Sequence, residues 1–326
     1  MPRFLSRLAV AGTALALAAG LTTPTASLAA ASQAVGGPAS RSGTLTWAAL
    51  GDSYTAGVIE ATGELTAPAD GCGRTTGSYP EVLRRDLGSR VSLRNVSCSG
   101  ATVLDVSANK QSPSGRPLPP LGTDPDAPYP AVPPQADAVG PDTDVITVGV
   151  GGNDLGFAGI LKDCIMLGAT SLNRGTPCKD EYDPRLPGLL AELRTHYSAM
   201  LGTLRTKAPA ARIVSVGYPH LVPENAALCT YGDLLQFSTV TTGDLAWARA
   251  AVLEPLNALI AQETTARGGT FVDLYADSAG HSVCDADHWL DGVLTSIIPL
   301  RYALVHPNAR GQAFAAARVR TAVLGG

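Results

Sequence analysis

The chain has 326 residues, of which 45% are hydrophobic and 16% are charged, and its formal net charge is −4. That length suits one large α/β domain with a sizeable core. A mildly acidic chain without a basic tract is a poor candidate for binding nucleic acid, so we expect no nucleic-acid partner.

The N-terminal segment is typical of a secretory signal peptide. Arg3 and Arg7 precede an apolar run at 8–21, and small residues at 29–31 form a cleavage site. We therefore expect a signal peptide at 1–31, a flexible tail at 32–43 and one folded domain at 44–326. Removing residues 1–31 deletes two Arg and no acidic residue, which leaves a net charge of −6. The run is too short for a membrane anchor, so we expect a secreted monomer whose contact with a lipid interface is at most transient.

The segment 44–50 predicts a buried β-strand, because it is apolar, lacks polar alternation and lies between Gly43 and Gly51. It leads directly into Gly51-Asp52-Ser53, and a helix is expected to follow. Ligands of parallel α/β sheets bind beyond the carboxyl ends of the strands, where a helix N-terminus also offers free N–H groups. Ser53 is therefore placed as a nucleophile would be; the plain alternative is a turn with a helix cap.

Helices and strands alternate through the first half. A loop at 59–77 precedes a helix expected from Ser78 or Tyr79 to about Gly88, with Pro80 in its first turn. Strands are predicted at 91–98, followed by a short helix, and at 144–150, the latter apolar and β-branched enough for a central position. The proline-dense segment 113–134 is expected to be a long surface loop, either inert or forming a wall of the pocket.

The second half continues the alternation. We expect helices at 184–207 and 309–323, a helix at 241–267 kinked or broken at Pro255, and strands at 212–216 and 270–274. This order predicts a parallel sheet of about five strands with right-handed crossovers and helices on both faces.

Three strand ends carry small or polar residues that can face one crevice, namely Ser53, Gly100 and Asn153. Acyl transfer needs a nucleophile, a base and donors for the tetrahedral oxyanion. Ser53 can attack while its own backbone N–H donates. Gly100 offers a backbone N–H without a shielding side chain, and Asn153 offers a side-chain N–H. A histidine must then reach Ser53.

Four motifs together resemble the sequence blocks of the SGNH (GDSL) hydrolases. In chain order they are Gly51-Asp52-Ser53-Tyr54, Gly100, Gly151-Gly152-Asn153-Asp154 and His306-Pro307-Asn308. The match spans about residues 45–320, and the chain is most similar to the secreted actinobacterial lipases and esterases of that family. The resemblance implies a single flavodoxin-like α/β/α sandwich with Ser53 as nucleophile, His306 as general base, and Ser53, Gly100 and Asn153 as the oxyanion hole. We expect no cofactor and no metal.

One position departs from the pattern of the family. Many members place an Asp three residues before the histidine, and Ala303 stands there in this chain. We expect a backbone carbonyl of Ala303 or Leu304 to accept the Nδ1 proton, as in some secreted relatives. The rival is an acid from elsewhere, for which the candidates are Asp285, Asp287 and Asp291.

Six cysteines in a secreted chain favour three disulfides, for which fifteen pairings exist. Proximity suggests Cys72–Cys98, Cys164–Cys178 and Cys229–Cys284, and the resemblance implies the same pairing. A metal site at His281, Cys284, His288 and Asp291 is the disfavoured alternative, because it would leave another cysteine unpaired.

The predicted function is hydrolysis of carboxylic, in particular fatty-acyl, esters by a lipase or esterase. A phospholipase A-type enzyme and a carbohydrate acetyl esterase are the alternatives within the family. A non-catalytic cell-wall or ligand-binding protein is the alternative outside enzymes. The absence of a Gly-x-Ser-x-Gly elbow disfavours an ordinary α/β-hydrolase.

Overall fold

A computed structural model describes residues 43–59, 62–116, 118 and 124–325. The predicted signal peptide, nearly all of the predicted tail and part of the proline-dense loop lie outside these residues. In the described part of the chain, no helix combines the length and apolar character needed to cross a bilayer.

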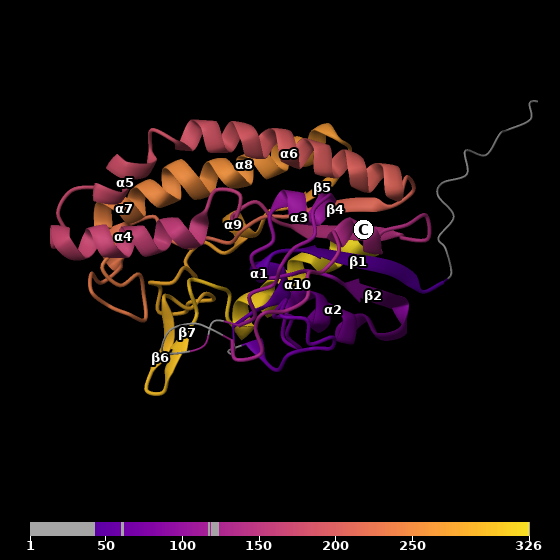
Figure 1. Cartoon of the computed structure of the whole chain (residues 1–326), viewed down its shortest axis with the longest axis horizontal. Coiled ribbons are helices and arrows are strands. Elements are labelled where there is room, and N and C mark those ends of the chain that lie inside the picture. Colours follow the sequence, from indigo (N-terminus) through magenta and orange to yellow (C-terminus); the bar gives the residue numbers. More distant parts are fainter. Residues whose placement is uncertain (1–42, 60–61, 117, 119–123, 326) are drawn as a thin grey trace, which may run out of the picture. The chain divides into compact units, whose positions relative to one another are not determined.

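Five parallel strands form the central sheet, in the order β2-β1-β3-β4-β5. Their bounds are β1 Leu45–Gly51, β2 Val91–Asn95, β3 Val145–Gly149, β4 Arg212–Val216 and β5 Thr270–Val272. The predicted fold class is confirmed: the sheet and the helices on its faces form an α/β sandwich (Figure 1). β3 is buried along its whole length at the centre, as its apolar sequence predicted.

Helices cover both faces of the sheet (Figure 1). Trp47 and Ala49 of β1 point to the face covered by α2 (Tyr79–Leu87) and α10 (Ala309–Leu324). Ala48 and Leu50 point to the opposite face, which packs on three helices. Those three are α3 (Val103–Ser107), α6 (Leu186–Lys207) and α8 (Glu254–Ala266). β1 is buried on both sides from Trp47 to Leu50, and its sequence there is apolar.

The predicted helix at 241–267 is interrupted before Pro255. The chain runs as α7 (Thr242–Trp247), then a π-helical segment (Ala248–Leu253), then α8 with the proline in its first turn. Proline lacks an N–H to bond the preceding turn, and a π-helical segment absorbs the mismatch without ending the helix. The helix is therefore continuous, and its departure from α-helical geometry lies directly before Pro255.

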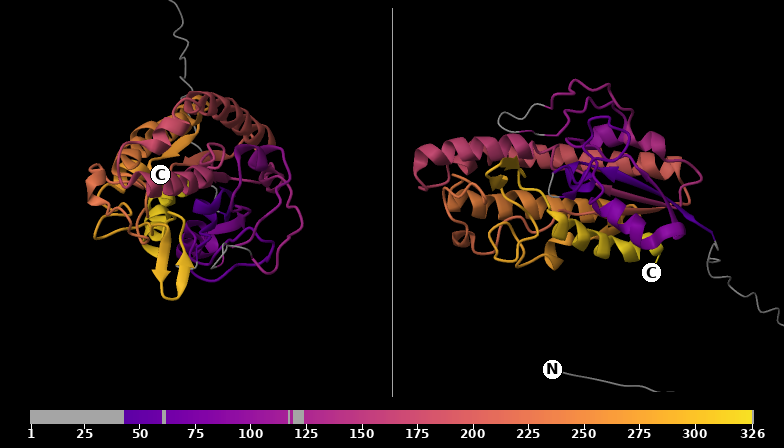
Figure 2. Two further views of the ribbon diagram at one scale, coloured as in Figure 1. Left: turned by 60° about the vertical axis from the view of Figure 1, so that its left-hand side comes forward. Right: turned by 90° about the horizontal axis from the view of Figure 1, so that it is seen from below.

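Two features were not predicted. The helices α4 (Phe157–Ser171) and α5 (Pro177–Tyr182) are joined by the Cys164–Cys178 disulfide. α4 buries only Ile160, Cys164 and Gly168, so its inward stripe is too short on apolar residues to show helical periodicity. The second is an antiparallel hairpin of β6 (Leu294–Ile297) and β7 (Leu300–Tyr302), which projects from the body in Figure 1 and in the left view of Figure 2.

Short elements complete the described chain. The helix α1 (Ser53–Ala56) follows β1, and α9 (Leu274–Asp277) follows β5. Single 3₁₀ turns occur at Gly88–Arg90, Gln135–Ala138 and Ala226–Leu228. The strand predicted at 91–98 ends at Asn95, because the chain there leaves the sheet edge for the disulfide at Cys98.

Candidate active site

The turn from β1 into α1 requires glycine at position 51. Gly51 has φ +146°, and a Cβ there would lie 2.5 Å from the carbonyl oxygen of Gly149 and 2.4 Å from Thr55 Oγ1. β1 and β3 therefore approach closely at their carboxyl ends. Asp52 caps α1 by accepting the N–H of Tyr54 at 2.9 Å. Ser53 thus begins a helix at the carboxyl edge of the sheet.

The structure brings Ser53 and His306 together. Their Oγ and Nε2 atoms are 2.7 Å apart, although 253 positions separate the residues in the chain. His306 Nδ1 lies 2.9 Å from the carbonyl oxygens of both Ala303 and Leu304. Since a carbonyl can only accept, Nδ1 carries the proton, and the Nε2 lone pair faces the serine hydroxyl.

The loop before His306 has an unusual backbone conformation. Leu304 and Val305 have φ of +51° and +61°, a left-handed conformation that is costly for a β-branched residue. Three hydrogen bonds fix it: Leu304 N–H to Val293 O at 3.0 Å, Val305 N–H to Gly292 O at 2.7 Å, and the Tyr54 hydroxyl to Val305 O at 2.6 Å. In this conformation the carbonyls of both residues 303 and 304 reach Nδ1.

The ring is neutral over most of the pH range. Burial lowers the pKa of His306 to about 4, and the two carbonyls oppose that shift because they favour the protonated ring.

The rival acids are bonded elsewhere. Asp285 accepts from the backbone and hydroxyl of Ser282 at 2.7 Å, and Asp287 pairs with Arg310. Asp291 accepts from Asn308 Nδ2 at 3.0 Å. Among the described residues, the partners of His306 Nδ1 are the two carbonyls.

Donors from two further strand ends lie at the same edge. Gly100 follows β2 with φ +80°, and neither its N–H nor that of Ser53 donates to another residue in the described part of the chain. Asn153 follows β3, and its side-chain amide donates one hydrogen to Ala101 O at 2.9 Å. The second amide hydrogen remains available to a ligand. The adjacent Asp154 accepts the N–H of Val103 at 3.1 Å and so ties the two loops together.

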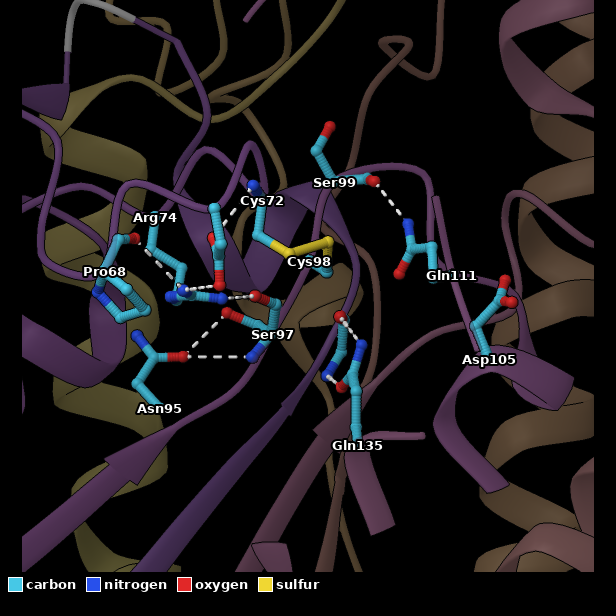
Figure 3. Close-up of a disulfide and its surroundings, with 12 residues drawn as sticks. Pro68, Cys72, Arg74, Asn95, Ser97, Cys98, Ser99, Asp105, Gln111 and Gln135 are labelled. Atoms are coloured by element: carbon cyan, nitrogen blue, oxygen red, sulfur yellow. Dashed lines mark hydrogen bonds and ion pairs between the residues drawn. A yellow bond between two sulfur atoms is a disulfide. The ribbon is translucent and has the colours of Figure 1, made fainter. Parts of the chain in front are cut away.

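The Cys72–Cys98 disulfide secures the loop that carries Gly100 (Figure 3). Cys98 N–H donates to Gly51 O at 2.9 Å, and Ser99 N–H donates to Cys72 O at 2.9 Å. Gln111 Nε2 donates to Ser99 O at 2.7 Å. The loop is therefore held from β1, from the disulfide and from a side chain, directly before the free N–H.

Several positioning residues were missed from the sequence. The Tyr218 hydroxyl accepts the Gly152 N–H at 2.8 Å and donates to Asp52 at 2.5 Å, which bridges the ends of β1, β3 and β4. Burial raises the pKa of Asp52 to about 7, and the Tyr218 bond opposes the rise. Gln312 on α10 accepts from Tyr79 N–H and donates to Tyr54 O. Tyr218 follows a predicted strand end, whereas Gln312 has no local signal.

A cavity of about 210 Å³ borders Asn153 between α3 and α6. Leu104, Leu189 and Leu193 line it, together with the polar side chains of Glu192 and His196. The cavity therefore offers apolar contacts beside the candidate oxyanion hole.

The residues of the disfavoured metal site, among them His281 and Cys284, make other contacts. Cys284 is bonded to Cys229, and the His281 ring stacks on Trp289 at a centroid distance of 3.6 Å. Among the residues described, no group of three His, Cys, Asp or Glu side chains could hold a metal ion.

Known proteins share both sequence and fold with this chain. A model of the GDSL-like lipase/acylhydrolase family matches residues 49–314. Over 306 residues the chain is 34% identical to Lipase 2 of Streptomyces coelicolor, covering 91% of this chain and 89% of that protein. The chain belongs to the GDSL-like lipase/acylhydrolase family.

Two solved structures extend the likeness of this GDSL hydrolase. Phospholipase A1 from Streptomyces albidoflavus superposes with a TM-score of 0.63 at 25% identity, covering 85% of this chain and 99% of that one. The extracellular lipase from Streptomyces rimosus superposes with a TM-score of 0.62 at 25% identity, covering 86% and 100%. As a family member, the protein is a carboxylic-ester hydrolase.

Proposed function

We propose that this GDSL hydrolase is a secreted lipase or esterase that cleaves fatty-acyl esters through an acyl-enzyme on Ser53. The observation that carries the proposal is the 2.7 Å contact between Ser53 Oγ and His306 Nε2, with both carbonyls at Nδ1. An intact serine–histidine pair argues against a non-catalytic binding protein, because a serine hydroxyl bonded to an oriented imidazole is the arrangement that nucleophilic catalysis needs.

In the first half-reaction His306 Nε2 takes the hydroxyl proton while Ser53 Oγ bonds to the ester carbonyl carbon. The carbonyl oxygen becomes an oxyanion, which the Ser53 N–H, the Gly100 N–H and the free Asn153 amide hydrogen stabilise. Collapse of the tetrahedral species breaks the ester C–O bond, and His306 returns its proton to the leaving alcohol. Water then repeats the sequence on the acyl-enzyme and releases the acid.

The carbonyls of Ala303 and Leu304 take over the orienting role of a triad acid. They accept the Nδ1 proton and so select the tautomer that presents Nε2 to serine. They carry only partial negative charge, so they stabilise the imidazolium less than a carboxylate would.

Three observations support a fatty-acyl substrate and secretion. The cavity beside Asn153 has three leucines among its lining residues, which offer apolar contacts to an acyl chain. Three disulfides, Cys72–Cys98, Cys164–Cys178 and Cys229–Cys284, suit an oxidising compartment. The relative from S. rimosus is an extracellular lipase. A phospholipase A-type activity is the second candidate, favoured by the superposition on phospholipase A1.

Active-site labelling and a substrate panel test the proposal. A fluorophosphonate should label Ser53, as found by peptide mass mapping, and Ser53→Ala should abolish both labelling and turnover. The panel compares p-nitrophenyl esters of rising chain length, a phosphatidylcholine and an acetylated sugar, and fatty-acyl esters should be turned over fastest. Labelling at another serine would refute the nucleophile, and preference for the acetylated sugar would refute the substrate class.

A further inference from the structure

The β6–β7 hairpin ends in an exposed apolar tip. Ile298 is 91% exposed and Ile297 51% exposed, and Pro299 beside them is exposed as well. Residues 292–300 contain no charged side chain. Apolar side chains gain no stability from exposure to water, and a contiguous group of them marks an interaction site.

The base of the hairpin adjoins a second exposed apolar segment. Val293 N–H donates to Gln236 O at 2.7 Å, and Leu294 N–H donates to Leu234 O at 3.0 Å. Leu234 and its neighbour Leu235 are themselves more than two-fifths exposed. We call Leu234, Leu235, Ile297 and Ile298 the hairpin patch.

Exposed apolar side chains gather at this end of the domain. The described residues include eight large exposed apolar side chains, and seven of them lie on α4 or its C-cap, on the segment 226–236 or on the hairpin. Besides the hairpin patch they are Met166, Leu172 and Leu228. In Figure 1 these segments lie beyond the end of the sheet where α1 begins, which is the end that carries Ser53.

The hairpin is directly connected to the candidate base. Three residues separate the end of β7 from His306, and the N–H groups of Ala303 and Leu304 both donate to Val293 O at 3.0 Å. A surface that holds the hairpin patch would therefore lie beside the catalytic loop. In that arrangement, the ester group of a lipid would have only a short distance to move from the lipid surface to Ser53.

We infer that the hairpin patch docks this hydrolase onto an uncharged or zwitterionic acyl-lipid surface, with the tip residues Ile297 and Ile298 inserted among the acyl chains. The inference rests on the proposed function and specifies aggregated lipid as its substrate form. Charge decides the kind of surface: the tip is neutral and the mature chain is predicted to be net acidic, so an anionic bilayer would repel it. The exposed Arg301 and the half-buried Tyr302 stand at the base of the tip, where polar head groups would lie.

Vesicle binding tests the inference in a Ser53→Ala background, which prevents hydrolysis during the measurement. The parent should co-sediment with phosphatidylcholine vesicles, and Ile298→Asp should weaken binding by at least about tenfold, because it removes one inserted apolar side chain. Ser89→Asp is the matched control. It adds the same charge at an exposed turn before β2, at the opposite end of the sheet, and should bind as the parent does.

Kinetics in the active enzyme separate docking from chemistry. Ile298→Asp should raise the apparent KM on phosphatidylcholine vesicles by about tenfold or more, while kcat/KM on soluble p-nitrophenyl butyrate stays within about twofold. Ile298→Leu should restore the vesicle activity.

Three results would overturn the inference. The first is a parent protein that remains entirely in the vesicle-free supernatant. The second is an Ile298→Asp variant that turns over the soluble ester as poorly as it turns over vesicles, which would make the hairpin a positioning element for His306. The third is a dimer in sedimentation analysis that Ile298→Asp dissociates while vesicle binding is unchanged, which would identify a second copy as the occupant. Failure of the proposed function is distinguishable, because the parent would then leave the soluble ester intact whether or not it binds vesicles.

Discussion

Two histidines near the carboxyl edge of the sheet, His306 and His220, differ in what their ring nitrogens meet. Burial lowers the pKa of both rings. His306 has carbonyls at Nδ1 and a serine hydroxyl at Nε2, all within 2.9 Å. His220 is only 2% exposed and stacks on Tyr275, but neither of its nitrogens has a hydrogen-bond partner in the described part of the chain.

The comparison shows that burial and position alone do not make a histidine a base. Loss of solvent lowers the pKa of both rings and so favours the neutral form of each. Of the two, only His306 has one nitrogen directed by an acceptor and the other directed at the hydroxyl of the proposed nucleophile Ser53, and this difference comes from the backbone around it. The left-handed residues Leu304 and Val305 turn two carbonyls toward the ring.

The largest expected difference is in turnover. His306→Ala should lower kcat by on the order of 10⁴–10⁶, as loss of a catalytic base does in serine hydrolases. His220→Phe keeps the aromatic stack but removes both nitrogens, and should retain kcat within about tenfold. Steady-state kinetics on a soluble ester, with melting curves to verify folding, check both. If His220→Phe were as inactive as His306→Ala, the assignment of the general base to His306 would be contradicted.

The donors around His306 provide the next test. Asn153→Ala should lower kcat by about 10²–10³ with little change in KM, because an oxyanion exists only in the transition state. The measurement is the split between kcat and KM on one soluble ester. An effect confined to KM would show that Asn153 binds the ground state and does not stabilise the oxyanion.

The pH dependence tests the neutral state of His306. Since only the neutral ring accepts the proton and burial lowers its pKa to about 4, kcat/KM should stay level down to about that pH and fall roughly tenfold per unit below it. Circular dichroism at each pH separates titration from unfolding.

An acid limb centred near 6.5 would contradict the lowered pKa. Asp52 and Asp154, whose pKa values burial raises to about 7 and about 6, are two other groups nearby that could give a limb. A limb near 7 that disappears in Asp52→Asn would therefore assign the titration to Asp52 and not to His306.

The smallest effect is expected from the rival acids. Asp285→Asn, Asp287→Asn and Asp291→Asn should each keep kcat within about tenfold of the parent, because all three carboxylates are bonded to groups other than His306. Loss of a true triad acid costs about 10⁴. A nearly inactive Asn variant would therefore mean that a carboxylate, and not the two backbone carbonyls, orients the His306 ring. The comparison with His220 would then name the wrong partner for Nδ1.

Much of the fold was open to prediction because it depends on local patterns. The strands at 212–216 and around 45–51 and the α2 and α10 helices follow from apolar runs and caps, and all occur as predicted. The disulfides join the neighbouring cysteines that proximity suggested. α4 escaped prediction because its buried stripe includes a cysteine and a glycine, which do not count as strongly apolar.

By itself, the sequence determined which residues are available for chemistry and where each stands along the chain: a serine after a glycine turn, a glycine and an asparagine after two further strands, and a histidine near the end. Each depends on a few adjacent residues, so local chemistry suffices. Tertiary structure alone decided that both carbonyls reach His306 Nδ1, because the backbone of Leu304 and Val305 is held by contacts such as that from Tyr54, 251 positions away. It also decided that the uncharged segment 292–300 forms a projecting hairpin, because pairing and exposure depend on where the rest of the chain packs.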